Sequence, residues 1–583
     1  MSVTNRHFSN HLLSIVSLQF QLRSAAIIAA VPSLLAAQNG TQTSAPLPLK
    51  HTPQPTSPAI TAGDLMTRLY IFADDSMMGR ETGTRGHLIS TAYIANELQR
   101  LGLKPAGDNG TFFQNVPMIR RAFDERSTIT VDGTTLQGGK DFIATAATGA
   151  APSLGTVDVV FGGRAGDTTG ALAPDQLRGK LLLQYPAQRG AGRGAFGRGG
   201  FGRGGAAAVA TIEAITPEAL RLATHPREGQ VTLKTPTPGA PPGLVSLTVT
   251  PDAARALLGT DPATATRGQS GKTATLHLVF DEEPAPARNV VAIIPGSDPK
   301  LRGEYVALGA HNDHVGVLAT AAQNHDSLHA FRQAQFAIDG LVRRGQQPTP
   351  EQQAQLNALH VNFDSLRQAH PIRMDSIRNG ADDDGSGSVT LLEIAEAFAS
   401  ATPKSKRSLL FVWHTGEEKG LLGSRWATDH LPVPADSIVA QLNMDMVGRG
   451  AAQDIPGGSE RYLQLVGSRR LSTELGDVVE QVNKTESMPF TFDYQYDANG
   501  DPENIYCRSD HYNYARLGIP VVFFTTGLHG DYHQVTDEPQ YIDYPHMARV
   551  GQLVHDVALK VANLDHRPLV DKPKPDPNAR CQQ

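Results

Sequence analysis

The sequence predicts an α/β protein in which a mostly parallel central sheet lies between helices on both faces, with a small, mostly-β module inserted into the chain. Near-continuous apolar runs rich in Val, Ile, Leu and Phe, such as "NVVAIIPG", "EYVALGAH" and "SLLFVWHTGEE", recur in the second half. Helix-like segments such as "SVTLLEIAEAFAS" separate them. This alternation is typical of buried parallel strands covered by helices, a three-layer α/β/α arrangement.

The composition indicates a folded protein rather than a disordered one. Hydrophobic residues make up 40% of the 583 residues and charged residues 19%, as in ordinary globular domains. The formal net charge of −6 is mild, so the balance suggests neither a nucleic-acid partner nor an anionic membrane surface. Cys507 and Cys581 are the only cysteines. Two thiols cannot build a disulfide framework, and their scarcity says little about compartment.

The N-terminus predicts export. Arg6 and Arg23 precede the apolar run "AAIIAAVPSLLAA" (25–37), which ends in small residues and is too short to span a bilayer. We interpret residues 1–37 as a secretory signal peptide cleaved near Ala37; the alternative is a disordered leader with a chance apolar patch. No later stretch approaches transmembrane length. The mature protein is expected in a periplasm or outside the cell, with an uncleaved signal as its only possible membrane anchor.

The remaining chain divides by composition and periodicity. Residues 38–60, rich in Pro, Thr and Ser, predict a linker, and residues 61–149 open with two amphipathic helices that begin the main domain. Short β-like runs predict the inserted module over residues 150–285. Its "RGAGRGAFGRGGFGRGG" segment (189–205) is interpreted as a mobile surface loop. The main domain resumes over 286–565 with a polar, helical insertion at 319–378, and a tail follows at 566–583.

Candidate metal ligands stand where the apolar runs end. His311 and Asp313 follow "YVALGA", and Glu417 and Glu418 follow "SLLFVWHTG". Asp445 follows "IVAQLNM", and His533 follows "VVFFTTGLHGDY". Because open sheets build their sites beyond the carboxyl ends of strands, these side chains are expected to converge, together with Asp383 at a probable loop-to-helix junction.

The stretch "NGADDDGSGS" (379–388) also matches a calcium-binding EF-hand loop. Two observations argue against calcium. Imidazole suits zinc and its neighbours, whereas calcium takes oxygen ligands and has no use for His311 or His533. The preceding "RQAHPIRMDSIRNG" is interrupted by Pro371 and closes on Asn-Gly, which is a poor entering helix. We therefore predict that the acidic triplet belongs to a zinc site.

Six motifs, in order, carry a family resemblance: "GAHNDHVG", "NGADDDGSGS", "HTGEEKGLLGS", "LNMDMVG", "YCRSDHYNYARLGIP" and "DYHQVTDE". They resemble the co-catalytic zinc aminopeptidases that include bacterial leucyl aminopeptidase and aminopeptidase Y, with glutamate carboxypeptidase II as a more distant relative. The resemblance covers most of residues 61–145 and 286–565. The β module in between is similar to the protease-associated domain that several members carry as an insert.

The resemblance implies a role for each matched residue. Asp383 would bridge two Zn²⁺ ions per chain, with His311 and Asp445 completing one ion and Glu418 and His533 the other. Glu417 would act as general base toward the attacking water. Asp313 would fix the imidazole of His311. Asp382 and Asp384 are expected to shape the turn and the following helix start.

Two choices stay open within this resemblance. Tyr506 is similar to the oxyanion-stabilising tyrosine of the bacterial aminopeptidases, and Tyr532 to that of the carboxypeptidase branch. The loop "FDYQYDANGDPENIY" offers Asp497, Asp501 and Glu503 to hold a substrate ammonium, whereas Arg508 could hold a carboxylate. We favour an aminopeptidase acting on peptides over a carboxypeptidase or dipeptidase; an insertion that walls the pocket would restrict it to short peptides.

Readings outside enzymology are a catalytically inactive receptor-like relative and a calcium-binding module. An inactive relative would typically have lost ligands or the base, yet all five ligands and Glu417 are present. The sequence gives neither side-chain preference nor oligomeric state.

Overall fold

The computed structural model describes residues 47–146, 154–165, 167, 172–186, 206–227, 229–234, 245–318, 323–343, 349–351, 354, 373–455, 457–501, 503–577, 581 and 583. The predicted signal peptide (1–37) and the Gly/Arg-rich loop (189–205) lie outside the described residues. So does much of the predicted insertion (319–378). Among the described residues, none of the helices combines the length and the apolar character needed to cross a bilayer.

The larger sheet runs in the order β19-β18-β20-β17-β13-β16-β12-β2-β9, with β1 paired to β12. Its strands are β1 (Lys104–Pro105), β2 (Phe113–Phe123), β9 (Thr232–Leu233), β12 (Phe280–Ile294), β13 (Tyr305–His311), β16 (Ser408–His414), β17 (Ile438–Met444), β18 (Tyr462–Val466), β19 (Thr491–Asp493) and β20 (Val521–Thr525). The central strands β16, β13, β17 and β20 are parallel. Antiparallel strands flank them, so the sheet as a whole is mixed.

Helices cover both faces of this sheet, as the apolar runs predict. Every residue of β16 and β17 is buried, which explains why these strands show no polar alternation. On one face, Val412 of β16 shares a core cluster with Tyr514 and Ala515 of α13 (His511–Ala515). On the other, the indole of Trp413 donates to the Ser388 carbonyl of α10 (Gly387–Ser400) at 3.0 Å. Adjacent residues of one strand therefore reach opposite helical layers.

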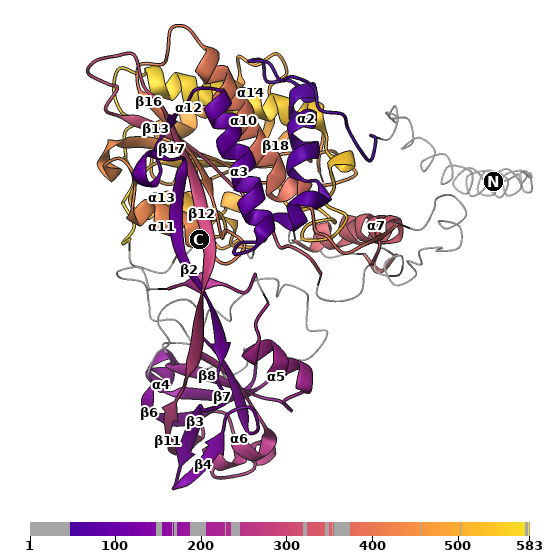
Figure 1. Cartoon of the computed structure of the whole chain (residues 1–583), viewed down its shortest axis with the longest axis vertical. Helices are drawn as coiled ribbons and strands as arrows, with labels where there is room; N and C mark the ends of the chain where they lie inside the picture. The colour runs from indigo at the N-terminus through magenta and orange to yellow at the C-terminus, as the bar shows by residue number, and fades with distance from the viewer. Residues whose placement is uncertain are drawn as a thin grey trace, which may run out of the picture. The chain divides into compact units, whose positions relative to one another are not determined.

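Further helices complete these layers (Figure 1). They are α2 (Ala62–Phe72), α3 (Arg85–Arg100), α11 (Leu422–Asp429), α12 (Thr473–Asn483) and α14 (Tyr544–Asn563). The two predicted amphipathic helices are α2 and α3, and the hydroxyl of Thr61 caps α2 by accepting from the Asp64 amide at 3.1 Å. The short helix η1 (Asp75–Arg80) lies between them. Buried α10 and α14 contact each other, α2 and β13.

The second sheet is the β module. Its order is β4-β3-β11-β6-β7-β8-β10-β5, and its elements are β3 (Thr128–Val131), β4 (Thr134–Gln137), β5 (Phe142–Ala146), β6 (Gly155–Arg164), α4 (Pro174–Leu177), β7 (Leu181–Tyr185), β8 (Ala208–Ile212), α5 (Pro217–Thr224), β10 (Val245–Val249), α6 (Pro251–Leu258) and β11 (Ser270–His277). It has its own buried core, whose residues run from Phe123 to Leu276. The sequence predicted that this module starts at residue 150, but strands β3, β4 and β5 of its sheet come from before that residue.

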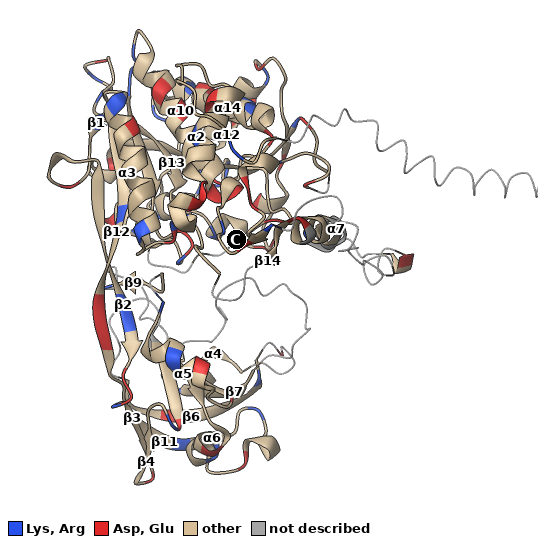
Figure 2. Ribbon diagram, turned by 45° about the vertical axis from the view of Figure 1, so that its right-hand side comes forward, with Lys and Arg blue, Asp and Glu red and all other residues tan. Residues whose placement is uncertain are grey.

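A long two-stranded ribbon, formed by β2 and β12 of the larger sheet, connects the larger sheet to the second sheet. β2 and β12 pair antiparallel from Phe123↔Phe280 to Phe113↔Val290. Oppositely charged side chains pair across this ribbon. Arg120 bonds to Glu283 at 3.0 Å and Arg121 to Glu282 at 2.8 Å. Figure 2 shows basic and acidic residues as blue and red bands on the two neighbouring strands. Cross-strand pairs of opposite charge favour this register.

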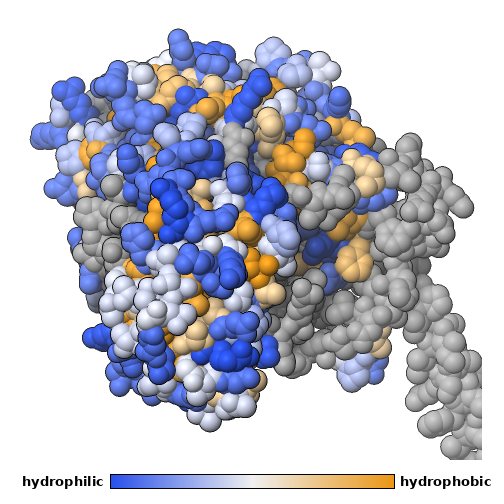
Figure 3. Space-filling view, turned by 60° about the horizontal axis from the view of Figure 1, so that its bottom comes forward, coloured by the Kyte–Doolittle hydropathy of each residue, from blue (hydrophilic) through white to orange (hydrophobic). Residues whose placement is uncertain are grey.

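Within the predicted insertion, the described residues form one long helix and a small strand pair. Helix α7 (His325–Arg343) covers the stretch predicted as helical. Immediately before it, β14 (Gln323–Asn324) pairs with β15 (Met374–Asp375), so the two ends of the insertion meet. On the face shown in Figure 3, apolar residues are scattered among hydrophilic ones.

Candidate functional site

The carboxyl ends of the central parallel strands carry the predicted ligands to one edge of the sheet. His311 is the last residue of β13, Asp445 follows β17 directly, and Glu417 and Glu418 follow β16 after a short turn. His533 lies in the loop after β20, in a left-handed backbone conformation with φ of 59°. Such strained backbone is costly for a non-glycine residue and concentrates at functional sites.

One group of possible ligands surrounds Glu418. Nε2 of His533 lies 3.0 Å from an oxygen of Glu418 and 3.0 Å from Oδ2 of Asp383. Nδ1 of His314 lies 3.0 Å from the other oxygen of Glu418. These four residues offer ligand atoms that all lie within 4.8 Å of one another. The His533 side chain is 30% exposed, whereas that of Asp383 is 4% exposed, so this group opens to the outside on the His533 side.

The second group surrounds His311. Its Nε2 lies 3.2 Å from Oδ1 of Asp383 and 3.5 Å from Oδ1 of Asp445. Ser509 donates to the other oxygen of Asp445 at 2.7 Å, which orients that carboxylate. Asp383 therefore turns one oxygen to each group, as a carboxylate that bridges two metal ions must.

Four histidine nitrogens in the two groups lack ordinary hydrogen-bond partners. Nε2 of His311, Nε2 of His533 and both nitrogens of His314 make no hydrogen bond of normal geometry, although these atoms are buried. Buried polar atoms without partners are rare in folded proteins and call for an explanation. Two histidine-and-carboxylate groups sharing one aspartate fit two zinc ions or similar first-row cations.

The neighbours of Asp383 hold the turn η4 (Ala381–Ser386) in place. Asp384 accepts hydrogen bonds from the amides of His311 at 2.9 Å, Gly387 at 2.9 Å and Met446 at 3.2 Å. Asp382 accepts from the Gly448 amide at 2.6 Å. Both side chains thus act on the backbone, as the sequence analysis expected, although an oxygen of Asp384 also lies within 4.8 Å of the ligand atoms of His311 and Asp445.

The EF-hand interpretation does not fit this turn. Residues 373–380, which precede it, contain β15 and irregular backbone but no helix. Both oxygens of Asp384 and Oδ1 of Asp382 accept from backbone amides, and Oδ2 of Asp382 lies 3.1 Å from Nε2 of His529, so these oxygens do not point into a common loop centre. An EF-hand loop needs both an entering helix and convergent oxygens.

Asp313 supports the site differently from the expectation. Its backbone carbonyl lies 3.0 Å from Nδ1 of His311, whereas its carboxylate is 3.8 Å from that nitrogen. The carboxylate instead accepts from Thr82 at 2.8 Å and from the Glu417 amide at 3.1 Å. Burial raises the pKa of Asp313 to about 7. The carbonyl thus orients His311, and the carboxylate positions the backbone of Glu417.

Glu417 lies where a base is needed. It lines a pocket whose wall also includes Asp383 and Asp445. Burial raises the pKa of Glu417 well above its usual range; His311 opposes this effect, and Glu418 and Asp445 add to it. A carboxylate that binds a proton more tightly than usual is suited to accept one from water near neutral pH.

The two candidate tyrosines occupy different places. Tyr532 lines the pocket and faces the negative charge of Asp383 and Glu418. Tyr506 is also buried but does not line the pocket. The guanidinium of Arg470 lies 4.4 Å from the centre of its ring, which also contacts His511. Of the two hydroxyls, that of Tyr532 is placed to meet a substrate.

The charged residues proposed to hold a substrate terminus also differ in their position relative to the pocket. Asp497 pairs with Arg470, and Glu503 pairs with Arg508 at 3.2 Å. Asp501 accepts from the Glu503 amide within its own turn. None of these three acids lines the pocket, whereas Arg508 does. The remaining wall is largely apolar and includes Met446, Ile505, Phe523 and Leu528.

A disulfide braces the wall beside Tyr506. Cys507, at the end of η7 (Ile505–Cys507), is bonded to Cys581 in the predicted tail, 74 residues away. The sequence analysis did not predict this pairing. Two cysteines in a chain with an export-like leader were the available signal, because a lone pair of cysteines in an oxidising compartment commonly pairs.

His314 is the ligand candidate that sequence reasoning missed. It belongs to the "HNDH" stretch but follows no strand end of its own. The turn after β13 places the ring of His314 next to the carboxylate of Glu418. A histidine three residues after a predicted ligand was the signal that could have drawn attention to it.

The fold and the site together indicate a class: an α/β protein with a candidate two-cation centre of histidines and carboxylates at the carboxyl edge of its sheet. Residues 344–558 match the family model described as Peptidase family M28. This match agrees with the resemblance to co-catalytic zinc aminopeptidases that the six motifs carry.

Fungal proteins are among the similar sequences. A probable leucine aminopeptidase of Trichophyton verrucosum (strain HKI 0517) is 28% identical over 222 residues, which are 36% of this chain and 56% of the relative. Leucine aminopeptidase 1 of Arthroderma gypseum (strain ATCC MYA-4604 / CBS 118893) is 26% identical over 252 residues, 41% of this chain and 62% of the relative. The matches thus span little more than half the length of these curated relatives.

Similar solved structures include the aminopeptidase from Aneurinibacillus sp. strain AM-1, with 16% identity and a TM-score of 0.45, covering 88% of this chain and 97% of that one. A zinc aminopeptidase from Bacillus subtilis has 18% identity and a TM-score of 0.44, covering 89% and 100%.

Proposed function

We propose that the chain is an exported, zinc-dependent exopeptidase that removes residues from the N-terminus of peptides. One observation carries the proposal: Asp383 turns one oxygen to the His311 group and the other to the His533 group, with Glu417 in the wall of the same pocket. This is the arrangement that two-metal hydrolysis of a peptide bond requires.

His311 and Asp445 would hold one zinc ion, Glu418 and His533 the other, and Asp383 both. His314 is placed to add a ligand on the Glu418 side. Once bound, the two ions would polarise the scissile carbonyl and make a nearby water more acidic. Glu417 would accept the proton of the attacking water and deliver it to the leaving amine. The hydroxyl of Tyr532 would donate to the oxyanion as it develops.

The similar proteins named as leucine aminopeptidases favour the N-terminus as the point of attack. The apolar wall formed by Ile505, Phe523 and Leu528 supports the same choice, because it suits an aliphatic or aromatic side chain next to the scissile bond. Short peptides are the proposed substrates.

A carboxypeptidase is the second candidate, and Arg508 is the observation that favours it. Arg508 reaches the pocket, whereas the acids expected to bind an ammonium do not. A guanidinium can bind a substrate carboxylate in a bidentate manner. The guanidinium of Arg508 already donates to the Glu503 carboxylate, which offsets part of its charge. Aminopeptidase therefore remains the first proposal.

The test combines metal analysis with turnover. We expect zinc in the purified chain and hydrolysis of an aminoacyl-arylamide that falls by about 10²- to 10⁴-fold in Glu417→Gln. The matched control is Glu480→Gln, a change at a surface glutamate of α12 that pairs with Arg469. Absence of zinc, or full activity in Glu417→Gln, would contradict the hydrolase proposal.

The terminus is tested with blocked peptides. An aminopeptidase cleaves peptides with an amidated C-terminus and leaves N-acetylated ones intact; a carboxypeptidase of the Arg508 type does the reverse and loses activity in Arg508→Ala.

We also propose a signal peptide over 1–37, export from the cytoplasm, and a protease-associated-like inserted module whose strands run from β3 to β11 and so begin before residue 150. The disulfide between Cys507 and Cys581 supports export, because such bonds persist in oxidising compartments.

A further inference from the structure

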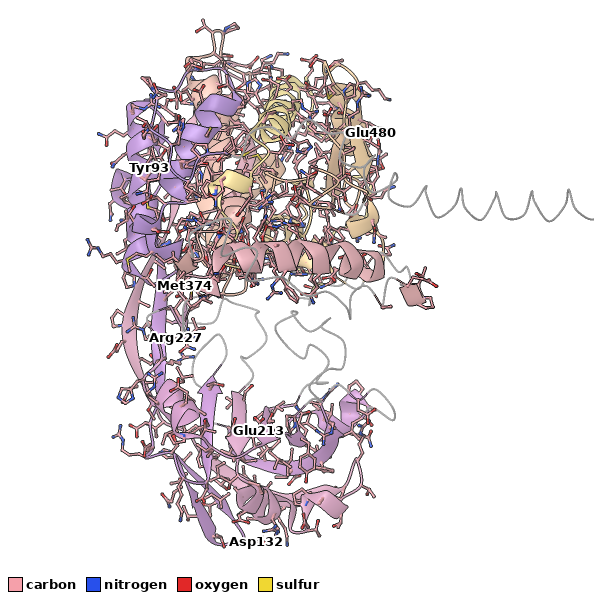
Figure 4. All side chains as sticks on the ribbon, turned by 90° about the vertical axis from the view of Figure 1, so that its right-hand side faces the viewer. Tyr93, Asp132, Glu213, Arg227, Met374 and Glu480 are labelled. Carbon is pink, nitrogen blue, oxygen red and sulfur yellow. A yellow bond between two sulfur atoms is a disulfide. The ribbon has the colours of Figure 1, made fainter. Side chains whose placement is uncertain are left out.

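A third cluster of possible ligands lies apart from the two groups around Asp383. His325, Asp375 and Glu538 offer ligand atoms that all lie within 4.8 Å of one another. They come from three distant parts of the chain: the first residue of α7, the last residue of β15, and the residue that caps η8 (Pro539–Tyr541). The pairing of β14 with β15 brings the first two together, and Figure 4 shows Met374 of β15 beside α7.

His325 is oriented as a metal ligand. Its side chain is fully buried, and its Nδ1 lies 3.2 Å from Oδ1 of Asp326. A proton on Nδ1 leaves the lone pair on Nε2, which has no hydrogen-bond partner. A carboxylate that fixes the tautomer in this way accompanies most histidine ligands of metals.

The ring of His325 is also held in place. It stacks on Tyr541, with ring centres 5.8 Å apart and an angle of 13° between the planes. The amide of His325 donates to the Arg373 carbonyl at 2.9 Å. Both contacts fix the start of α7 against β15 and η8, so Nε2 keeps its direction without a partner.

The two carboxylates are in an electrostatically unfavourable place. Glu538 is 7% exposed and accepts one hydrogen bond, from Asn379 at 3.2 Å. One carboxylate oxygen of Asp375 lies within 4.8 Å of one carboxylate oxygen of the buried Glu538. A bound cation would compensate the negative charge that two such close carboxylates bring together.

We propose that His325, Asp375 and Glu538 form a third metal site that binds Zn²⁺ or a similar first-row cation. One imidazole nitrogen and two carboxylate oxygens match zinc, whereas calcium would use only the oxygens. Three protein donors leave a tetrahedral ion one position for water. The carboxylates and the ring would approach the ion by small side-chain rotations, since the atoms already lie within 4.8 Å.

This third ion would hold helix α7 of the insertion to the segment that supports the turn at Asp383. Asp537, next to Glu538, accepts from the amides of Asp382 and Asp383 at 3.0 Å. Fixing Glu538 to His325 therefore connects α7 to the turn that carries Asp383. The role is structural, because the ligands of the third site are separate from those of the other two groups.

Metal content of the full chain tests the proposal. After purification with Zn²⁺ and removal of excess metal, mass spectrometry should find about three zinc ions per chain. The variants His325→Gln and Glu538→Gln should each lose about one ion and keep the other two. The matched control is His566→Gln, because His566 is 64% exposed and pairs with Glu474 on the surface. Its zinc content should equal that of the wild type.

Asp383→Asn provides the complementary arm. It should lose zinc from the paired centre yet keep about one ion, and the combination with His325→Gln should keep none. Two or fewer ions in the wild type, or unchanged zinc in both His325→Gln and Glu538→Gln, would refute the third site. Asp375→Asn replaces any variant that fails to fold, as judged by circular dichroism. These outcomes are independent of turnover, so they stay distinct from failure of the peptidase proposal.

Discussion

Three consecutive aspartates, 382 to 384, show how differently neighbouring residues of one type can be used. Asp383 faces histidines of both ligand groups. Asp384 accepts from three backbone amides that belong to His311, Gly387 and Met446. The bridging position and the supporting position are therefore adjacent in the chain but make different contacts.

Asparagine substitutions should separate these roles. Asp383→Asn is expected to abolish turnover and metal binding at the paired centre, because an amide cannot supply an anionic oxygen to each ion. Asp384→Asn is expected to lower the unfolding free energy by about 1–3 kcal/mol, because an amide nitrogen in place of one oxygen leaves a backbone N–H unpaired. Chemical denaturation and zinc analysis measure the two effects. Equal zinc loss in both variants would contradict the assignment.

The two tyrosines give a second test at the level of single residues. Tyr532→Phe should lower kcat by about 10²- to 10³-fold with little change in folding, since the hydroxyl faces the pocket. Tyr506→Phe removes a hydroxyl outside the pocket lining and should leave kcat within a few-fold of wild type. Steady-state kinetics on both variants measure the two kcat values. A larger loss of kcat in Tyr506→Phe than in Tyr532→Phe would assign the oxyanion role to Tyr506.

Among the secondary-structure elements, a buried ion network joins three helices. Arg68 of α2 bonds to Glu97 of α3 at 2.6 Å and also contacts Glu393 and Glu396 of α10. Burial raises the pKa of Glu393 to about 7 from 4.5, even though Arg68 opposes the shift. The helices that support the turn at Asp383 are therefore connected by charges that burial disfavours.

The pKa of Glu393 predicts a pH dependence of stability. Because the folded state raises this pKa, the protonated group contributes stability below pH 4.5, and the contribution is lost as the pH rises through about 7. Relative to Glu393→Gln, the wild type should lose ~2–3 kcal/mol of unfolding free energy between about pH 5 and about pH 8. Urea denaturation of both proteins measures the difference. A difference that does not change with pH would contradict the shift.

Elements with strong periodicity were predictable, and irregular ones were not. Strands β16 and β17, which are fully buried, and β13, which is buried except at Tyr305, appear as continuous apolar runs, and each directs a ligand to the sheet edge. Strands β3 and β4 are only four residues each and are joined by a glycine turn, so the start of the second sheet was placed too late. His314 depends on a loop path, which sequence periodicity does not report.

At the scale of the whole molecule, the disulfide ties the chain end to the pocket wall. Reducing it, or substituting Cys581→Ser, should destabilise the protein by up to about 4 kcal/mol, because a loop of 74 residues is released in the unfolded chain. Thermal melts with and without reductant measure the loss, and Cys581→Ser should then be insensitive to reductant. An unchanged melting temperature on reduction would show that the bond adds no stability.

The register of β2 with β12 has a consequence for how this chain came about. Phe123 and Phe280 face each other across the ribbon, so everything between them enters and leaves the larger sheet at one point. Among the described strands between these two residues, only the short β9 returns to pair with β2. In evolutionary terms the whole second sheet is an enlarged hairpin loop, which an ancestor could acquire or discard by a single insertion without rerouting any strand that carries a ligand.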